Sequence, residues 1–197
     1  MKLALATLAL LCLALPGCGG AGMTTEGKPH SSATGATATT SSAPPAASAK
    51  FSMTSPAFGN NTPIPAEYSC KGRNVPPTLR WQNVPPGSES LALVVDDPDA
   101  PGGSYVHWVV TGIPPTTTEI GQGPLPAGAS VRQNSGGKAE YLGPCPPAGS
   151  GVHHYRFQLY ALPEPLDVPP TTPAQQASQT IGKAATAVAG TVGLFSG

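Results

Sequence analysis

The placement of proline is the strongest constraint on how this chain can fold. Twenty-one of its 25 prolines lie after residue 50 and recur throughout that region. Proline fixes φ and donates no backbone hydrogen bond, so it interrupts helices and sheet interiors. The same region holds both tryptophans, all five tyrosines and all four phenylalanines, enough apolar surface to bury a core. We therefore predict one domain over residues 51–197, built mostly from short β-strands joined by turns.

Short apolar segments between the proline-rich turns mark the expected strands. Residues 91–95 form an apolar run with two valines, which is typical of a buried strand. Residues 155–160 mostly alternate between apolar and polar side chains, as a half-buried strand does. The expected strands are residues 79–81, 91–95, 105–110, 155–160 and 192–195.

Only residues 172–189 have a composition that favours a helix, with no proline after Pro173. Thr172 suits the N-cap, and Pro173 suits the first turn. A set of apolar residues is spaced to share one helix face: Ala177, Ile181, Ala184, Ala185 and Val188. The predicted fold class is therefore mostly β, with one C-terminal helix.

The first 17 residues have the pattern of an export signal. Lys2 is the only charge before Glu26, and residues 3–15 are apolar apart from Thr7. That length is typical of a secretory signal and too short to span a membrane. Residues 15–18, Leu-Pro-Gly-Cys, resemble a bacterial lipobox, which predicts cleavage before Cys18 and lipidation of Cys18. An ordinary signal peptide with a chance cysteine is the alternative.

Residues 18–50 resemble a tether in composition. They are rich in alanine, serine, threonine and glycine and contain no aromatic side chain. Such a segment buries too little apolar area to offset the entropy lost on ordering. We therefore expect an exported protein, lipid-anchored on the extracytoplasmic face of the cell membrane, with a flexible spacer before its domain.

Charged groups are few, balanced and unevenly distributed. The chain has ten basic and ten acidic residues, so it lacks the basic surface that nucleic-acid binding requires. Three of its four aspartates lie within residues 96–99, and three of its four histidines are His107, His153 and His154. Residues 143–151, rich in proline and glycine, precede the last two histidines and could form an anion-binding loop. This clustering predicts a polar site.

These segments resemble the phosphatidylethanolamine-binding protein family, and its bacterial Raf-kinase-inhibitor-like branch most closely. The matching motifs are Asp-Pro-Asp-Ala-Pro at 97–101, His-Trp at 107–108, and Gly-Pro-Cys-Pro-Pro at 143–147 followed by a closing histidine and tyrosine. The resemblance covers essentially all of residues 51–197. It implies an antiparallel β-sandwich with a small pocket at one end that accepts phosphate-like groups and small carboxylates. The ligand-binding residues it implies are Asp97, Asp99, His107, Gly143, Cys145, Pro146, Pro147, His153 and Tyr155.

Individual roles within this pocket follow from chemistry and strand alternation. We expect His107 and His153 to supply N–H donors to an anion. Asp99 is assigned mainly to the pocket, and Asp97 mainly to a turn that its carboxylate caps. Alternation along an extended strand predicts that Trp108 faces away from the pocket side that Tyr105 and His107 share. By the same rule, His154 should face away from His153.

The predicted function is a binding protein for a small phosphorylated or lipid-like ligand, without a cofactor. One alternative is a protein–protein regulator such as a protease inhibitor. Another is a hydrolase with Cys145 as nucleophile and His153 as base. No familiar catalytic motif is present, and neither H-x-x-x-H nor C-x-x-C metal spacing occurs. We therefore predict no enzyme activity and no metal site.

The cysteines offer a further structural prediction. Cys12 would leave with the signal peptide and Cys18 would carry lipid, so Cys70 and Cys145 remain. An even pair in an oxidising compartment favours a disulfide. The alternative is two buried thiols that serve packing.

Lipidation of Cys18 can be tested by membrane partitioning. The wild-type protein should enter the detergent phase of a Triton X-114 separation, because several acyl chains on one residue anchor stably. Cys18→Ala should move the protein into the aqueous phase. Unchanged partitioning of the variant would show that Cys18 carries no anchor.

Overall fold

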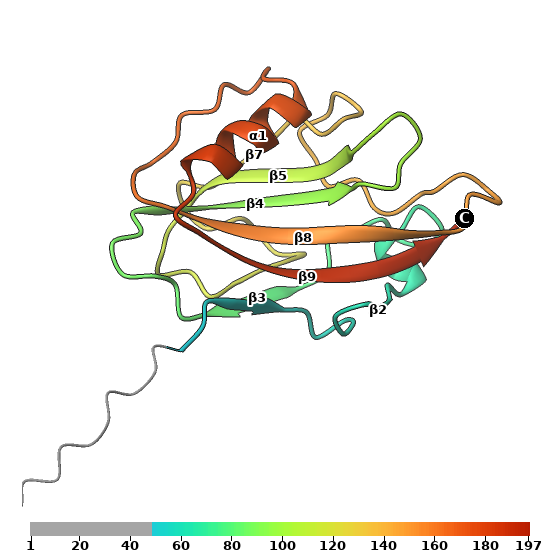
Figure 1. Ribbon diagram of the computed structural model, residues 1–197, viewed down its shortest axis with the longest axis horizontal. Coiled ribbons are helices and arrows are strands. Elements are labelled where there is room, and N and C mark those ends of the chain that lie inside the picture. Colours follow the sequence, from blue (N-terminus) through green and yellow to red (C-terminus); the bar gives the residue numbers. More distant parts are fainter. Residues whose placement is uncertain (1–48) are drawn as a thin grey trace, which may run out of the picture. The chain divides into compact units, whose positions relative to one another are not determined.

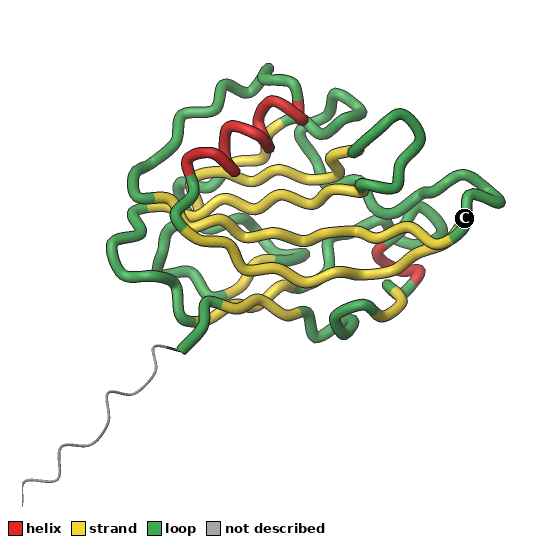
Figure 2. Tube along the Cα trace, viewed as in Figure 1, coloured by secondary structure: helices red, strands yellow, loops and turns green. Residues whose placement is uncertain are grey.

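The computed structural model describes residues 49–197. The predicted signal peptide, Cys18 and most of the predicted tether lie outside the described residues. The domain is mostly β, with one α-helix (Figure 2). Within residues 49–197, no helix combines the length and apolar character needed to cross a membrane.

Two sheets form the domain (Figure 1). The larger sheet has six strands in the order β2-β9-β8-β4-β5-β7, and the smaller has three in the order β1-β3-β6. Every pairing is antiparallel except that of β2 with β9. A short 3-10 helix spans Ala66–Tyr68. The strands are β1 (Ser52–Thr54), β2 (Thr62–Pro63), β3 (Leu79–Gln82), β4 (Ser90–Asp97), β5 (Tyr105–Ile113), β6 (Glu119–Ile120), β7 (Ser130–Arg132), β8 (Val152–Leu162) and β9 (Ala187–Ser196).

The main core lies between the two sheets. Leu79 and Trp81 of the smaller sheet share this core with Leu93 and Val95 of β4 and Phe157 of β8. Leu79, Leu93 and Phe157 are completely buried. Burying such side chains contributes about 1.5–3 kcal/mol each and fixes which face of every strand points inward.

A second core lies on the outer face of the larger sheet, under helix α1 (Ala174–Ala184). Ala177 and Ile181 of α1 pack against Val94 of β4 and Val106 and Val109 of β5. Strand β4 is therefore buried on both faces along its whole length. Its apolar run reflects this position between the two cores. The predicted mostly β sandwich with a C-terminal helix is confirmed, and all five predicted strands are present.

The predicted helix is too long at its C-terminal end. Helix α1 ends at Ala184, and residues 187–189 belong to β9, which pairs with β8 over ten residue positions. The hydrogen bonds of this long ladder outweigh the helical preference of alanine. Pro173 occupies the N-cap without a side-chain hydrogen bond, so the prediction of Thr172 as cap is wrong. Ala177 and Ile181 are buried as expected, whereas Val188 is exposed on β9.

A β-bulge changes the orientation expected for Trp108. Val95 pairs with Trp108 and Asp96 pairs with Val106, so His107 is an extra residue in β5. Such a bulge interrupts strict alternation. Trp108 packs into the core between the sheets, and the His107 ring contacts Tyr155 of that same core. The prediction that the two side chains face opposite ways is therefore wrong.

Cys70 and Cys145 form a disulfide with their Cα atoms 5.4 Å apart. The structure thus has the bridge and not two packed thiols. The amide of Cys70 also donates to the carbonyl of Pro144 over 3.1 Å. Together these contacts hold residues 143–147 against the loop after the 3-10 helix.

Removing the disulfide should destabilise the domain strongly. Replacement of both cysteines by alanine should lower the free energy of unfolding by about 4 kcal/mol, because the bridge closes a long loop in the unfolded chain. Urea denaturation of the full-length protein measures this loss. Alkylation without reduction, followed by mass spectrometry, should leave Cys70 and Cys145 unmodified. Two alkylated cysteines in the native protein would contradict the bridge.

Candidate functional site

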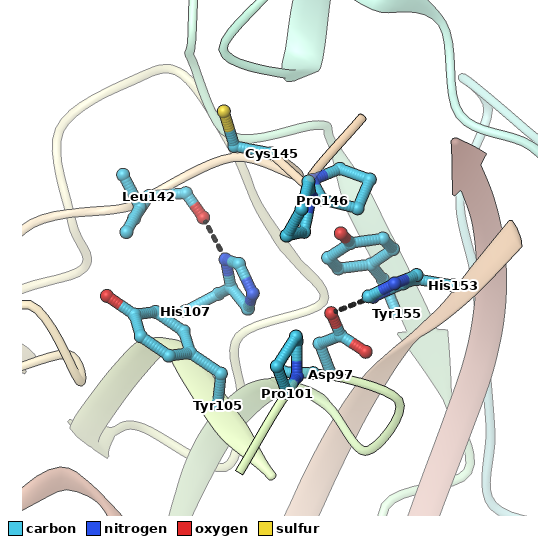
Figure 3. A pocket seen from close by; sticks show the side chains of 11 residues that line it. Asp97, Pro101, Tyr105, His107, Leu142, Cys145, Pro146, His153 and Tyr155 are labelled. Carbon is cyan, nitrogen blue, oxygen red and sulfur yellow. Dashed lines mark hydrogen bonds and ion pairs between the residues drawn. The ribbon is translucent and has the colours of Figure 1, made fainter. Parts of the chain in front are cut away.

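A cavity of about 290 Å³ lies where β4 ends and β5 and β8 begin (Figure 3). Its walls come from the end of β4 with the loop that follows, the first residues of β5 and β8, and the loop that the disulfide holds. Seven of the nine predicted ligand-binding residues line it: Asp97, His107, Cys145, Pro146, Pro147, His153 and Tyr155. Tyr105 also lines it, as alternation predicted, together with Ala100, Pro101 and Leu142, which sequence reasoning missed. Whether these residues bind a ligand remains a prediction.

Asp97 and His153 form a buried pair at the base of this cavity. The Nδ1 atom of His153 lies 2.7 Å from Oδ2 of Asp97, and both side chains are less than 5% exposed. The other carboxylate oxygen of Asp97 accepts a hydrogen bond from the amide of Asp99 over 2.9 Å. Asp97 therefore caps the turn, as predicted, and also holds His153 in place.

Asp99 lies outside the cavity, contrary to prediction. Its Oδ2 atom accepts the amide of His154 over 2.8 Å and contacts Nδ1 of the same histidine at 2.7 Å. The hydrogen bonds from His154 lower the pKa of the Asp99 carboxyl. His154 faces away from His153, as alternation along β8 requires. Asp99 contacts His154 and therefore lies on the exposed side with it. Asp97, not Asp99, is thus the pocket carboxylate.

His107 presents one ring nitrogen to the cavity. Its Nδ1 atom donates to the carbonyl of Leu142 over 2.8 Å. Burial lowers the pKa of His107, and the Leu142 carbonyl and the Asp97 and Asp96 carboxylates oppose that effect only in part. The imidazole is therefore neutral near pH 7. No group in the described part of the chain bonds its Nε2 atom.

Tyr155 brings a buried hydroxyl with no protein partner to the same cavity. The residue is 1% exposed, and its hydroxyl makes no hydrogen bond among residues 49–197. Burial raises the pKa of the Tyr155 phenol, and the Asp97 carboxylate raises it further. The phenol therefore keeps its proton. The Asp97 carboxylate and the Cys145 backbone lie close enough to this hydroxyl to shift its pKa, but neither meets it in hydrogen-bond geometry. A buried donor without a well-aligned acceptor costs about 1–3 kcal/mol, so this hydroxyl is a candidate donor to a ligand oxygen.

Gly143 supports the cavity loop without lining it. Its amide donates to Oδ1 of Asn74 over 2.8 Å. A Cβ atom at this position would lie 2.3 Å from the carbonyl oxygen of Tyr68, so only glycine fits there. Gly143 is therefore not among the residues that line the cavity, and direct ligand contact by it stays a prediction.

The structure also bears on the predicted chemistry of Cys145. Its sulfur is bonded to Cys70, so Cys145 offers no thiol, and the Cys145–His153 nucleophile–base pair is contradicted. Within residues 49–197, no group of three or more histidine, cysteine or acidic side chains is arranged to hold a metal ion.

Fold and cavity together define a small β-sandwich domain of the ligand-binding class. The model of the family described as phosphatidylethanolamine-binding protein matches residues 54–196. The chain belongs to this family, as its motifs predicted.

One relative matches nearly the whole chain, and three others match about three quarters of it. The Mycobacterium tuberculosis protein LppC, named as a candidate lipoprotein, is 50% identical over 99% of this chain and 96% of its own length. A UPF0098 protein of the same species is 48% identical over 75% of this chain and 71% of its own length. Among solved structures, Escherichia coli YbcL is similar with a TM-score of 0.72 and 31% identity, covering 75% of this chain and 99% of YbcL. The Chlamydia trachomatis homologue CT736 gives 0.67 and 31%, covering 75% of this chain and 97% of CT736.

Separate substitution of the two aspartates should distinguish their roles. Asp97→Ala leaves the buried Nδ1 donor of His153 without its acceptor and should cost about 1–3 kcal/mol of unfolding free energy. Asp99→Ala removes a contact between half-exposed groups and should cost at most about 1 kcal/mol. Urea denaturation of both variants measures the difference. Equal losses would contradict the distinct environments described here.

Proposed function

We propose that this protein is a membrane-anchored extracytoplasmic binding protein whose cavity takes a small anion, either phosphate-like or a small carboxylate. The observation that carries this proposal is the unpaired Tyr155 hydroxyl lining one cavity with the free Nε2 atom of His107. A phosphate or carboxylate oxygen accepts from the tyrosine hydroxyl. It also accepts from His107 once that ring takes up a proton.

Charge balance in the cavity is compatible with an anion. Among residues 49–197, Asp97 is the only carboxylate that lines it, and both of its oxygens already accept hydrogen bonds, one from His153. Its negative charge is therefore directed toward His153 and the Asp99 amide. Repulsion of a bound anion is reduced accordingly.

Cavity size restricts the ligand. A volume of about 290 Å³ is at the small end of the range for ligand pockets. It suits phosphate, a small carboxylate or a phospholipid head group, and it is too small for the acyl chains of a lipid. A phosphorylated small molecule or an exposed lipid head group is thus the partner we propose.

The proposed location is supported by the predicted lipobox and by the relative named as a candidate lipoprotein. That likeness extends over 99% of this chain and so includes the region around Cys18. The protease-inhibitor alternative remains an untested prediction.

Anion affinity should depend on pH through His107. Because the pKa of His107 is lowered in the free protein and a bound anion raises it, binding takes up a proton and tightens as pH falls. For a single coupled proton the gain is at most about tenfold per pH unit. Calorimetric titration of the full-length protein with sulfate, whose charge is constant between pH 5 and 8, measures this effect.

His107→Asn is the matched control for this experiment. Its amide NH₂ can still donate to the carbonyl of Leu142 but cannot take up a proton. The pH dependence should disappear in the variant, whereas His154→Gln, outside the cavity, should retain it. Failure of both sulfate and phosphate to bind the wild-type protein would refute the proposed function.

A further inference from the structure

Ser150 contacts the buried histidine of the cavity from the exposed loop before β8. Its Oγ atom lies 2.9 Å from Nε2 of His153, and Nδ1 of that ring lies 2.7 Å from Oδ2 of Asp97. Hydroxyl, imidazole and carboxylate are therefore linked in the order found in serine hydrolases. Gly149 and Gly151, both with positive φ, flank the serine and leave it accessible on the surface.

We propose that Ser150, His153 and Asp97 form a hydrolytic triad that cleaves small carboxylic esters beside the cavity, which His153 and Asp97 line. Ser150 is the nucleophile and His153 the general base. Asp97 is a positioning residue that acts through His153. This activity goes beyond the proposed anion binding, which uses His107 and Tyr155, although His153 lines the same cavity.

Hydrogen-bond accounting favours the required tautomer of His153. The Asp97 carboxylate can only accept, so the proton of a neutral imidazole resides on Nδ1. The single Ser150 hydroxyl proton then has two acceptors in reach, the carbonyl of Pro147 at 2.7 Å and the lone pair of Nε2 at 2.9 Å, and attack requires it to turn from the carbonyl to Nε2. Burial shields Asp97 and His153 from water, whereas Ser150 is exposed to it.

The proposed reaction is ordinary acyl transfer. The Ser150 oxygen attacks the ester carbonyl carbon, and its proton moves to Nε2 of His153. When the bond to the leaving oxygen breaks, His153 passes that proton to the departing alcohol. Water then attacks the acyl-serine with the same assistance, which releases the acid and restores Ser150.

Backbone amides beside Ser150 can stabilise the oxyanion. The amides of Gly149 and Gly151 donate to no acceptor within residues 49–197. Gly151 directly follows the nucleophile, a position whose amide serves as an oxyanion donor in other serine hydrolases. The adjoining cavity, partly walled by Pro146 and Leu142, provides an apolar space for a short acyl group.

A second turn in the same chain shows what Ser150 would be without a histidine. Residues 85–88 and 147–150 both read Pro-x-Gly-Ser, and both glycines have φ near +80°. In each turn the serine hydroxyl lies 2.7 Å from the proline carbonyl oxygen. Only Ser150 has a second acceptor, Nε2 of His153. Ser88 is therefore a built-in control for an ordinary turn serine.

A fluorophosphonate probe tests the proposal directly. Its phosphorus is attacked by the serine oxygen, fluoride leaves, and the hydroxyl proton passes to His153. Full-length protein is treated with the probe, and the rates at Ser150 and Ser88 are compared by peptide mass spectrometry. General-base assistance predicts labelling of Ser150 about 100-fold faster than that of Ser88.

Variants assign the effect to the triad. Ser150→Ala should abolish the fast labelling and the hydrolysis of p-nitrophenyl acetate above the buffer rate, whereas Ser88→Ala should leave both unchanged. His153→Gln should reduce labelling of Ser150 to the Ser88 rate. If that variant fails to fold, the labelling rates of Ser150 and Ser88 in the wild-type protein still test the proposal.

Labelling of Ser150 no faster than that of Ser88 would overturn the proposal and leave Ser150 as a structural turn residue. Sulfate titration of the wild-type protein reports anion binding separately. Binding without fast labelling refutes the triad alone, and fast labelling without binding refutes the proposed function alone.

Discussion

The register between the two buried strands β4 and β8 positions most of the polar chemistry of this domain. Asp96 pairs with Arg156 across the ladder, and their side chains form an ion pair on the face that α1 covers. Asp97, the next residue, points to the opposite face and meets His153 from the start of β8. Two adjacent carboxylates are thus directed to opposite faces of one sheet, each with a cation or imidazole in reach. A register shift of one residue would separate both pairs.

The bulge at His107 adds a constraint that regular strands could not provide. It brings two consecutive side chains, His107 and Trp108, to the same side of β5. Trp108 then fills the core against Tyr141, while His107 reaches the cavity beside Tyr155. A regular strand would send one of the two rings to the helix face. The β-bulge in β5 is therefore the feature that places the Nε2 atom of His107 at the cavity.

Sequence reasoning predicted the elements better than it predicted the contacts between them. Apolar runs and proline-rich turns locate the strands because both are local properties, and the family motifs locate most cavity residues. The roles of Asp97 and Asp99 depend on which histidine of β8 each meets, and that depends on long-range register. The end of α1 could not be predicted from local sequence. The alanine-rich residues 187–189 are compatible with a helix, and only their pairing with β8 makes them a strand. Gly143 has a similar explanation, since its constraint is the backbone of Tyr68.

The two Pro-x-Gly-Ser turns show why local sequence is a poor guide to chemistry in this protein. Both form the same type of turn, and in each the serine hydroxyl bonds the carbonyl of the proline three residues before it. Sequence and local conformation therefore assign the two serines one structural role. They differ only in tertiary surroundings, because the strand after Ser150 begins with the buried histidine that Asp97 holds. The proposed reactivity of Ser150 depends on a contact between β8 and β4, that of His153 with Asp97, which lie 56 positions apart in the chain. The Asp97–His153 pair that helps to form the cavity wall is therefore also the contact on which the proposed reactivity of Ser150 depends.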